Sequence, residues 1–308
     1  MTRLPNLRAR AFIGFFATLV LVAGIPALAY AQTRTKPVFD SWPRKVRMGG
    51  DAVIEGHVEN GSPGQEISIQ RKRSDSEWRT TNTKATDEDS AVTFHVNDLR
   101  VGANYRLVYI DPAGAEERSD EIRIGVVPRL TFEASKEDVM VHREVRLSGT
   151  LFPKMSGREI VLEQRVGGEW HSIGLLPVRD GRFEKTFSPD HHGYRQLRAR
   201  FEGDDRNAGA FSATGIRIYD PDPATWYGPG FYGQRTACGK RLQPGTLGVA
   251  HRNLPCGTDV AILYRGRTIT VPVIDRGPYG SADWDLTEET ADRLRFEGTD
   301  TIGVDPKS

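Results

Sequence analysis

The chain has 308 residues, of which 38% are hydrophobic and 9% aromatic, and its formal net charge at pH 7 is +1. This is enough apolar material for packed cores, so the composition excludes a wholly disordered chain, and the length suggests two or three domains. A charge this close to zero excludes attraction of the whole chain to nucleic acid. The 32 glycines and 18 prolines favour β-structure with many turns.

The N-terminus has the pattern of an export signal. Its positive start consists of Arg3, Arg8 and Arg10. An apolar run over residues 11–31 follows and ends in two small-x-small motifs, which are typical of signal-peptide cleavage. We therefore predict a cleaved signal peptide over residues 1–31, which leaves a chain of net charge −2 with no stable membrane insertion. The alternative is a retained anchor, because the run is nearly long enough to span a bilayer.

The next part of the chain contains an internal repeat. Its two copies cover residues 37–126 and residues 127–219. Trp78 matches Trp170, Tyr105 matches Tyr194, and matched positions lie 89 to 93 residues apart. A period this long predicts tandem domains rather than a solenoid. Alternating apolar and polar residues, in about seven short strands per copy, resemble bacterial immunoglobulin-like β-sandwiches, in which the two tryptophans would pack rather than bind ligand.

A third domain is expected over residues 224–308. The segment before it, Asp220-Pro221-Asp222-Pro223, is predicted to be a stiff linker, because proline fixes φ and blocks strand continuation. Within the domain we expect strands over residues 259–264 and 267–274. A helix is expected over residues 287–294, with Asp285 as its N-cap and Glu288 three residues later.

The chain has two cysteines, Cys238 and Cys256, and both lie in the third domain. An even number of cysteines in an exported chain predicts one disulfide, whose closure would contribute about 3 kcal/mol. A zinc site is not expected, because no Cys-x-x-Cys pair or nearby histidine accompanies them.

Several motifs in the third domain carry a family resemblance. They are WYGPGFYG at 226–233, TACGK at 236–240, AHRNLPCGT at 250–258, VIDRGPY at 273–279 and WDLT at 284–287. In order and spacing they resemble the rare lipoprotein A (RlpA) family, a six-stranded double-psi β-barrel that is also found in expansins. The resemblance covers about a quarter of the chain. With it, the expected fold is mainly all-β: two tandem immunoglobulin-like sandwiches followed by this barrel with a short helix.

The resemblance implies action on the glycan strands of peptidoglycan outside the cytoplasm. Some family members are lytic transglycosylases, which need no cofactor or metal, and expansin-like relatives bind polysaccharide without cutting it. This sequence departs from the family in having no lipid-attachment cysteine and no C-terminal glycan-binding repeat. Gln243 also stands eight residues before His251, where many members have an acidic residue.

The candidate catalytic residues are Asp275, Asp285 and His251. A lytic transglycosylase needs one acid, which protonates the leaving oxygen and then accepts the proton of the muramic acid C6 hydroxyl. Asp275 at a strand end is the first candidate, and its pKa would have to be raised, so we predict that Arg276 points away from it. The alternatives are an Asx-turn for Asp275, a helix cap for Asp285 and a structural role for His251.

Substrate-binding residues are expected around these carboxylates. Aromatic faces for sugar stacking could come from Tyr227, Tyr232, Tyr279 and Trp284, with core packing as the alternative. Arg252 and Arg276 could bind the lactyl carboxylate of muramic acid, with a solvated surface position as the alternative.

Three functions remain open from the sequence. The first is a peptidoglycan lytic transglycosylase, and the second is an expansin-like wall-binding domain without turnover. The third is a structural adhesin, in which the two sandwiches act as spacers.

Overall fold

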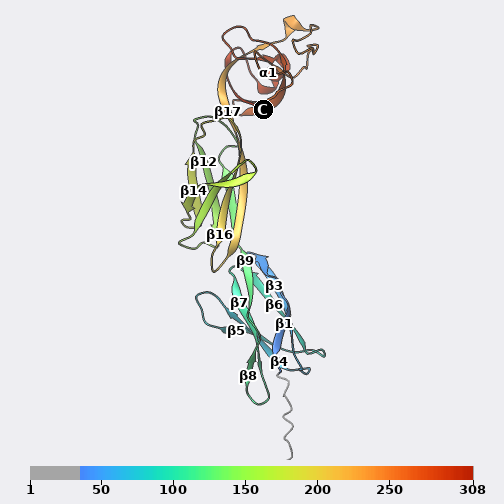
Figure 1. Cartoon of the computed structure of the whole chain (residues 1–308), viewed down its shortest axis with the longest axis vertical. Helices are drawn as coiled ribbons and strands as arrows, with labels where there is room; N and C mark the ends of the chain where they lie inside the picture. The colour runs from blue at the N-terminus through green and yellow to red at the C-terminus, as the bar shows by residue number, and fades with distance from the viewer. Residues whose placement is uncertain (1–34, 308) are drawn as a thin grey trace, which may run out of the picture. The chain divides into compact units, whose positions relative to one another are not determined.

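The computed structural model describes residues 35–307, so the predicted signal peptide lies outside the described residues. Within this part of the chain there are 22 β-strands, one α-helix and one 3₁₀ turn, and the chain is all-β as predicted (Figure 1). None of the described residues forms a helix with the length and apolar character needed to cross a membrane.

The first sandwich packs two sheets around one core. One sheet has the order β1 (Pro37–Ser41), β3 (Gly50–Val58), β6 (Ala91–Leu99). The other has the order β2 (Lys45–Arg47), β9 (Ile122–Val127), β7 (Ala103–Ile110), β4 (Glu66–Lys72), β5 (Arg79–Ala85), with β8 (Glu116–Arg118) on β7. Alternate residues of β3 and β4, such as Ile54 and Ile69, are buried between the sheets, because successive strand residues point to opposite faces.

The second sandwich repeats this arrangement. Its smaller sheet has the order β10 (Arg129–Ala134), β12 (Val145–Phe152), β15 (Arg182–Phe187). Its larger sheet continues through β14 (Glu169–Pro177), β13 (Glu159–Val166), β16 (Gly193–Gly203) and β17 (Ala208–Tyr227), with β11 (Asp138–Met140) on β17. Leu147, Ile160 and Leu197 are fully buried in the core between them. The two-sheet architecture agrees with the sequence, and the immunoglobulin-like assignment stays a prediction.

A shared surface feature aligns the two repeats. The Arg106 guanidinium lies 4.3 Å from the Trp78 ring centroid, and Arg198 lies at the same distance from Trp170. Both pairs of equivalent residues are 92 apart in the sequence. The match of Tyr105 with Tyr194 was therefore wrong: Tyr105 is fully buried in the first core, whereas Tyr194 is exposed.

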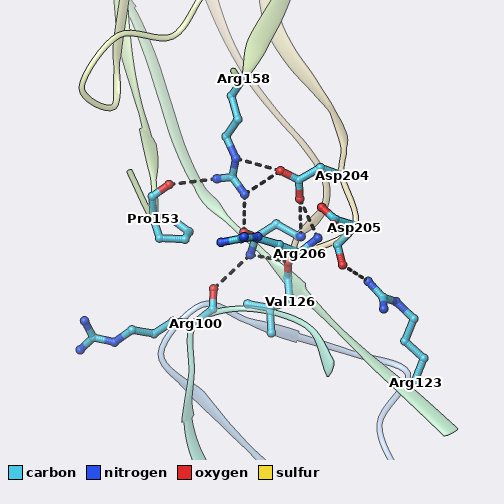
Figure 2. A network of polar contacts seen from close by, with 9 residues as sticks. Arg100, Arg123, Val126, Pro153, Arg158, Asp204, Asp205 and Arg206 are labelled. Carbon is cyan, nitrogen blue, oxygen red and sulfur yellow. Dashed lines mark hydrogen bonds and ion pairs between the residues drawn. The ribbon is translucent and has the colours of Figure 1, made fainter. Parts of the chain in front are cut away.

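A buried polar network joins the two sandwiches (Figure 2). Arg158, on the second sandwich, pairs with Asp204 at 2.9 Å and donates to Asn207 Oδ1 at 2.6 Å. The Asn207 amide then donates to the carbonyl oxygens of Arg100 and Val126, both on the first sandwich. Because every one of these groups is paired, burying them costs little, and the network fixes the contact between the repeats.

Strand β17 belongs to both the second sandwich and the third domain (Figure 1). The prediction of a linker at residues 220–223 was wrong, because the strand continues through both prolines. The Pro223 carbonyl oxygen accepts from Asp283 N, which directly precedes β21. Because alternate residues of a strand point the same way, both Pro221 and Pro223 direct their backbone groups toward the β21 edge of β17. The alternate residues Asp220, Asp222 and Ala224 point their backbone groups the other way, toward β22. The hydrogen bonds between β17 and β22 therefore do not need the N–H groups that the prolines lack.

The third domain is a closed barrel of six strands. Its order is β17, β21 (Trp284–Thr287), β18 (Val249–His251), β20 (Arg267–Asp275), β19 (Asp259–Tyr264) and β22 (Asp300–Pro306), and β22 pairs back onto β17. The barrel is filled by apolar side chains that include Val249, Val273 and Leu286. The predicted strands over residues 259–264 and 267–274 are confirmed.

The helix of the barrel, α1 (Glu288–Leu294), begins one residue later than predicted. Its N-cap is Thr287, whose side-chain oxygen accepts from Thr290 N, so the prediction that Asp285 is the cap was wrong. Asp285 lies inside strand β21 instead, where its side chain is available for other contacts. A short 3₁₀ turn (Pro229–Phe231) begins the segment that leads from β17 to β18.

Candidate functional site

The strand register brings Asp275 and Asp285 to one face of the barrel. Ala250 of β18 is paired with Asp275 on one side and with Asp285 on the other. Directly paired residues point to the same face of a sheet, so both carboxylates leave the same outer face, two strands apart. A register shift between Val249 and Ala250 makes this possible, because Val273 points into the core and an extra residue reverses the side for Asp275.

Asp275 is held by backbone donors. Its Oδ1 accepts from Ala237 N and from Arg276 N, both at 2.8 Å. Two backbone N–H groups therefore hold this carboxylate oxygen in a fixed position. Ala237 lies in the long segment between β17 and β18, so this contact also fixes that segment over the site.

Asp285 is in a different environment. Its carboxyl is largely buried, and burial raises its pKa above the ordinary value, with the nearby Asp275 charge acting in the same direction. Thr225 Oγ1 donates to Asp285 Oδ1 at 2.7 Å and offsets part of this effect. Asp285 therefore stays protonated to higher pH than an ordinary aspartate, whereas the sequence favoured Asp275 as the acid.

Tyr227 of β17 reaches Asp275 on the same face of the barrel. Its hydroxyl donates to Asp275 Oδ2 at 3.4 Å, and its ring packs edge-on against Phe231. Burial raises the pKa of Tyr227, and the charges of Asp275 and Asp285 raise it further, so the hydroxyl remains a donor throughout the neutral range. We call the face formed by Thr225, Tyr227, Ala250, Asp275 and Asp285 the carboxylate face.

The predicted disulfide between Cys238 and Cys256 is confirmed. It ties the segment that carries Ala237 to the loop between β18 and β19. Because Ala237 N is one of the two backbone donors to Asp275, the disulfide holds that donor in place.

His251 does not join the carboxylates. It follows Ala250 on β18, so its side chain leaves the opposite face, where its ring lies 4.4 Å from the Trp284 ring. Its Nδ1 accepts from Asn253 N and Leu254 N, which leaves Nε2 as the protonated nitrogen. Burial lowers the pKa of His251. The structure gives this histidine the contacts of a loop-supporting residue.

Arg252 and Arg276 differ in which groups their guanidinium donors already bind. Arg252 donates to the carbonyl oxygens of Pro278, Gly280 and Ala282 and pairs with Asp283. With four of its donors used, it clamps the 277–283 loop, and its prediction as a carboxylate-binding residue was wrong. Arg276 donates to the carbonyl oxygen of His251 and to Cys256 Sγ rather than to the Asp275 carboxylate, in agreement with the prediction that it points away.

The aromatic candidates separate by burial. Trp284 is 2% exposed, and its Nε1 donates to Asp222, so it is a core residue and its prediction as a sugar-stacking face was wrong. Tyr279, at 85% exposed, is free to contact a ligand. Tyr232 is partly buried, and its hydroxyl has no hydrogen-bond partner among the described residues.

Two partners of the carboxylates were missed from the sequence. Thr225 and the backbone of Ala237 contact Asp285 and Asp275 across 60 and 38 residues of chain. No local pattern signals such contacts, since they depend on strand pairing and on the path of a loop. Among the described residues no cluster of three metal-binding side chains is found.

Residues 223–305, the barrel, match the family model described as lytic transglycolase. The barrel is an RlpA-like domain. A probable endolytic peptidoglycan transglycosylase RlpA from Synechocystis is 50% identical to this chain over 58 residues, which cover 18% of each chain. The endolytic peptidoglycan transglycosylase RlpA of Campylobacter jejuni is 43% identical over 84 residues, 26% of this chain and 30% of that protein. The protein of the same name from Neisseria meningitidis serogroup A is 29% identical over 126 residues, 40% of this chain and 49% of that one.

The chain spans 18% to 49% of the length of the three relatives. A crystal structure of a tetra-tandem repeat from a large adhesion protein aligns over 88% of this chain and 73% of that one, with 11% identity and a TM-score of 0.35. A TM-score this low does not identify the fold of the two sandwiches.

Proposed function

We propose that this protein is exported and that its barrel cleaves peptidoglycan glycan strands as a lytic transglycosylase, leaving 1,6-anhydro-muramic ends. The observation that carries the proposal is the carboxylate face, with one carboxyl of raised pKa and one carboxylate held by backbone donors. The similarity of the barrel to proteins named as peptidoglycan transglycosylases supports the substrate class.

In the proposed reaction Asp285 is the acid and then the base. It gives its proton to the glycosidic oxygen as the bond from C1 of muramic acid breaks. The C6 hydroxyl of the same sugar then bonds to C1, and its proton passes to the Asp285 carboxylate. The proton count balances and no water is consumed, because the reacting hydroxyl is held close by the sugar itself. The raised pKa of Asp285 favours the protonated form that the first step needs.

Asp275 is proposed to act on the charge that develops during the reaction. A glycosidic bond breaks through a transition state with positive charge on the sugar ring, and a carboxylate on the same face of the barrel stabilises that charge. Tyr227, protonated at neutral pH, donates to Asp275 and keeps it oriented. This division of roles between two carboxyl groups follows from their environments, one buried and one hydrogen-bonded.

The test is release of anhydro-muramic products from glycan strands stripped of their peptides, measured by mass spectrometry. Asp285→Asn is expected to abolish release, since an amide cannot transfer the proton, while Asp275→Asn is expected to reduce it. Asp259→Asn, at an exposed aspartate of the same barrel, is the control and should retain full activity. Absence of release by the unaltered protein would contradict the proposed activity.

A binding role without turnover is the second candidate. It is favoured by His251, which points away from both carboxylates, and by the exposed Gln243, which stands where many family members have an acid. This candidate is supported if the protein sediments with insoluble wall and leaves the glycan length unchanged.

The two sandwiches are proposed to be immunoglobulin-like accessory domains over residues 37–126 and 127–219. They would hold the RlpA-like barrel, residues 224–308, outside the cytoplasm and close to the wall. Their role in the cell wall follows from the proposed activity of the barrel.

A further inference from the structure

The larger sheet of the second sandwich has one face that no other element covers among the described residues. Its outward side chains form cross-strand rows. Arg200 of β16 is paired with Phe211 of β17, and Tyr194 of β16 with Arg217 of β17. Between these rows lie two small residues of β17, Ala213 and Gly215. We call this surface, formed by β14, β13, β16 and β17, the outer β14–β17 face.

Two aromatic rings are raised above this face. Phe211 is 70% exposed and Tyr194 is 60% exposed. The Tyr194 ring lies across Gly215, where even a Cβ atom would come within 2.0 Å of the tyrosine oxygen. Phe211 and Gly215 are four residues apart on one strand, which is about 13 Å at 3.3 Å per residue. The two rings are therefore separated along the strand by a length that two or three sugar rings could span.

Guanidinium groups lie beside both rings. Arg198 packs on Trp170 at 4.3 Å and lies 5.8 Å from the Phe211 ring centroid, and Arg217 lies 5.7 Å from Tyr194. Arg198 is held from below by Glu163, whose side chain is only 5% exposed. Trp170 thus positions Arg198. This contact explains why Trp170 is half-buried on the surface of the sheet and not part of the core.

The charge of this part of the face is positive. Its charged side chains are four arginines, Arg165, Arg198, Arg200 and Arg217, and three acids, Glu163, Glu202 and Asp305. Aromatic rings and guanidinium groups alternate on this surface. They suit a ligand whose apolar and polar edges alternate and which carries carboxylates, because rings stack on C–H faces and arginine binds carboxylate.

We propose that the outer β14–β17 face binds a glycan strand that carries carboxylate groups. Strand β17 continues from this face to Thr225 and Tyr227 on the carboxylate face, eight and ten residues beyond Arg217. Arg217 also pairs with Asp305 of the barrel at 2.6 Å. Naming peptidoglycan as the glycan rests on the proposed function, in which case the second sandwich holds the strand that the barrel cuts.

The test measures co-sedimentation of the full chain with insoluble glycan stripped of its peptides, using Asp285→Asn so that the strands are not consumed. Replacing both Tyr194 and Phe211 with serine is expected to weaken binding by about tenfold or more. Gly215→Ala, which displaces the Tyr194 ring from its seat, is expected to weaken it as well. The matched control is Ile110→Ser, which removes an apolar side chain of similar exposure (63%) from the first sandwich and should leave binding unchanged.

Two further measurements make the outcome decisive. Glycan whose carboxylates have been converted to amides should bind more weakly, and intact peptidoglycan should bind no more tightly than stripped glycan if the strand rather than the peptide is recognised. Unchanged thermal unfolding of the variants shows that the fold is retained. If the double variant sediments like its parent, the proposal is overturned, even where the unaltered protein releases anhydro-products. If binding is lost in the double variant but no release is ever seen, the glycan-binding face stands and the proposed activity fails.

Discussion

Removing the Cys238–Cys256 disulfide tests how the carboxylate face is held together. The cysteines are 18 residues apart, and opening a loop of this length gives the unfolded chain about 3 kcal/mol of conformational freedom. With Cys238→Ser and Cys256→Ser together, amides of β18 and β20 should exchange about a hundredfold faster, since each 1.4 kcal/mol is a factor of ten. Glycan release should fall too, because Ala237 N is no longer held on Asp275.

Hydrogen exchange followed by mass spectrometry makes this prediction specific. Peptides from β4 and β7 of the first sandwich serve as the internal control and should exchange at an unchanged rate. Reducing agent should bring the unaltered protein to the exchange rate of the double variant and leave the variant itself unaffected. If the barrel amides exchange equally in both proteins, the loop-closure argument is refuted.

Three more substitutions test other parts of the structure. The folded-state pKa of Asp285 is raised, so its favourable contribution exists below its unfolded pKa and is lost as the pH rises through the folded one. Asp285→Asn should therefore melt higher than the unaltered protein at pH 7, with no difference below about pH 4. Asn207→Ala should cost about 1–3 kcal/mol in urea unfolding, because it leaves buried partners unpaired, whereas Asp205→Ala, at an exposed side chain, should change stability by less than about 0.5 kcal/mol. Gly149→Ala should destabilise by about 1–3 kcal/mol, because the new methyl would lie 2.1 Å from Thr131 O, whereas the matched change Gly230→Ala meets no atom within 4 Å and should be near neutral.

The strands of the barrel were readable from the sequence because their signals are local. Residues 259–264 and 267–275 alternate or run apolar on either side of a tight turn, and two strands joined this way pair with each other. The disulfide was also predictable from the sequence, because two cysteines in a chain with an export signal are enough to predict one disulfide bond. The order of the motifs identified the barrel itself.

The geometry of the carboxylate face was not readable. Asp285 is followed three residues later by Glu288, which mimics a capping box, but the chain remains extended through Thr287 because β21 pairs with β17 and β18. Asp275 points outward only because the register shift on β20 reverses its side. Neither effect can be inferred from spacing, since each depends on a partner strand far away in the chain.

The Asp-Pro-Asp-Pro segment shows why composition misled at the domain boundary. Proline disfavours the middle of a sheet because it lacks an N–H group, yet at alternate positions the lost donors all lie along one edge. Pairing with β22 uses the other edge, so the strand is not interrupted. The pattern of alternation, rather than the number of prolines, decided the outcome.

The first strand of the barrel, β17, begins within the second sandwich. The barrel therefore cannot be separated from that sandwich without losing part of its strand pairing. A fragment that starts at Ala224 would leave residues 301–304 of β22 with an open edge, ready to pair with a second molecule. Recombination that joins this barrel to a different partner would have to supply a replacement for that edge. Inheritance of the second sandwich and the barrel as one piece is the expected consequence.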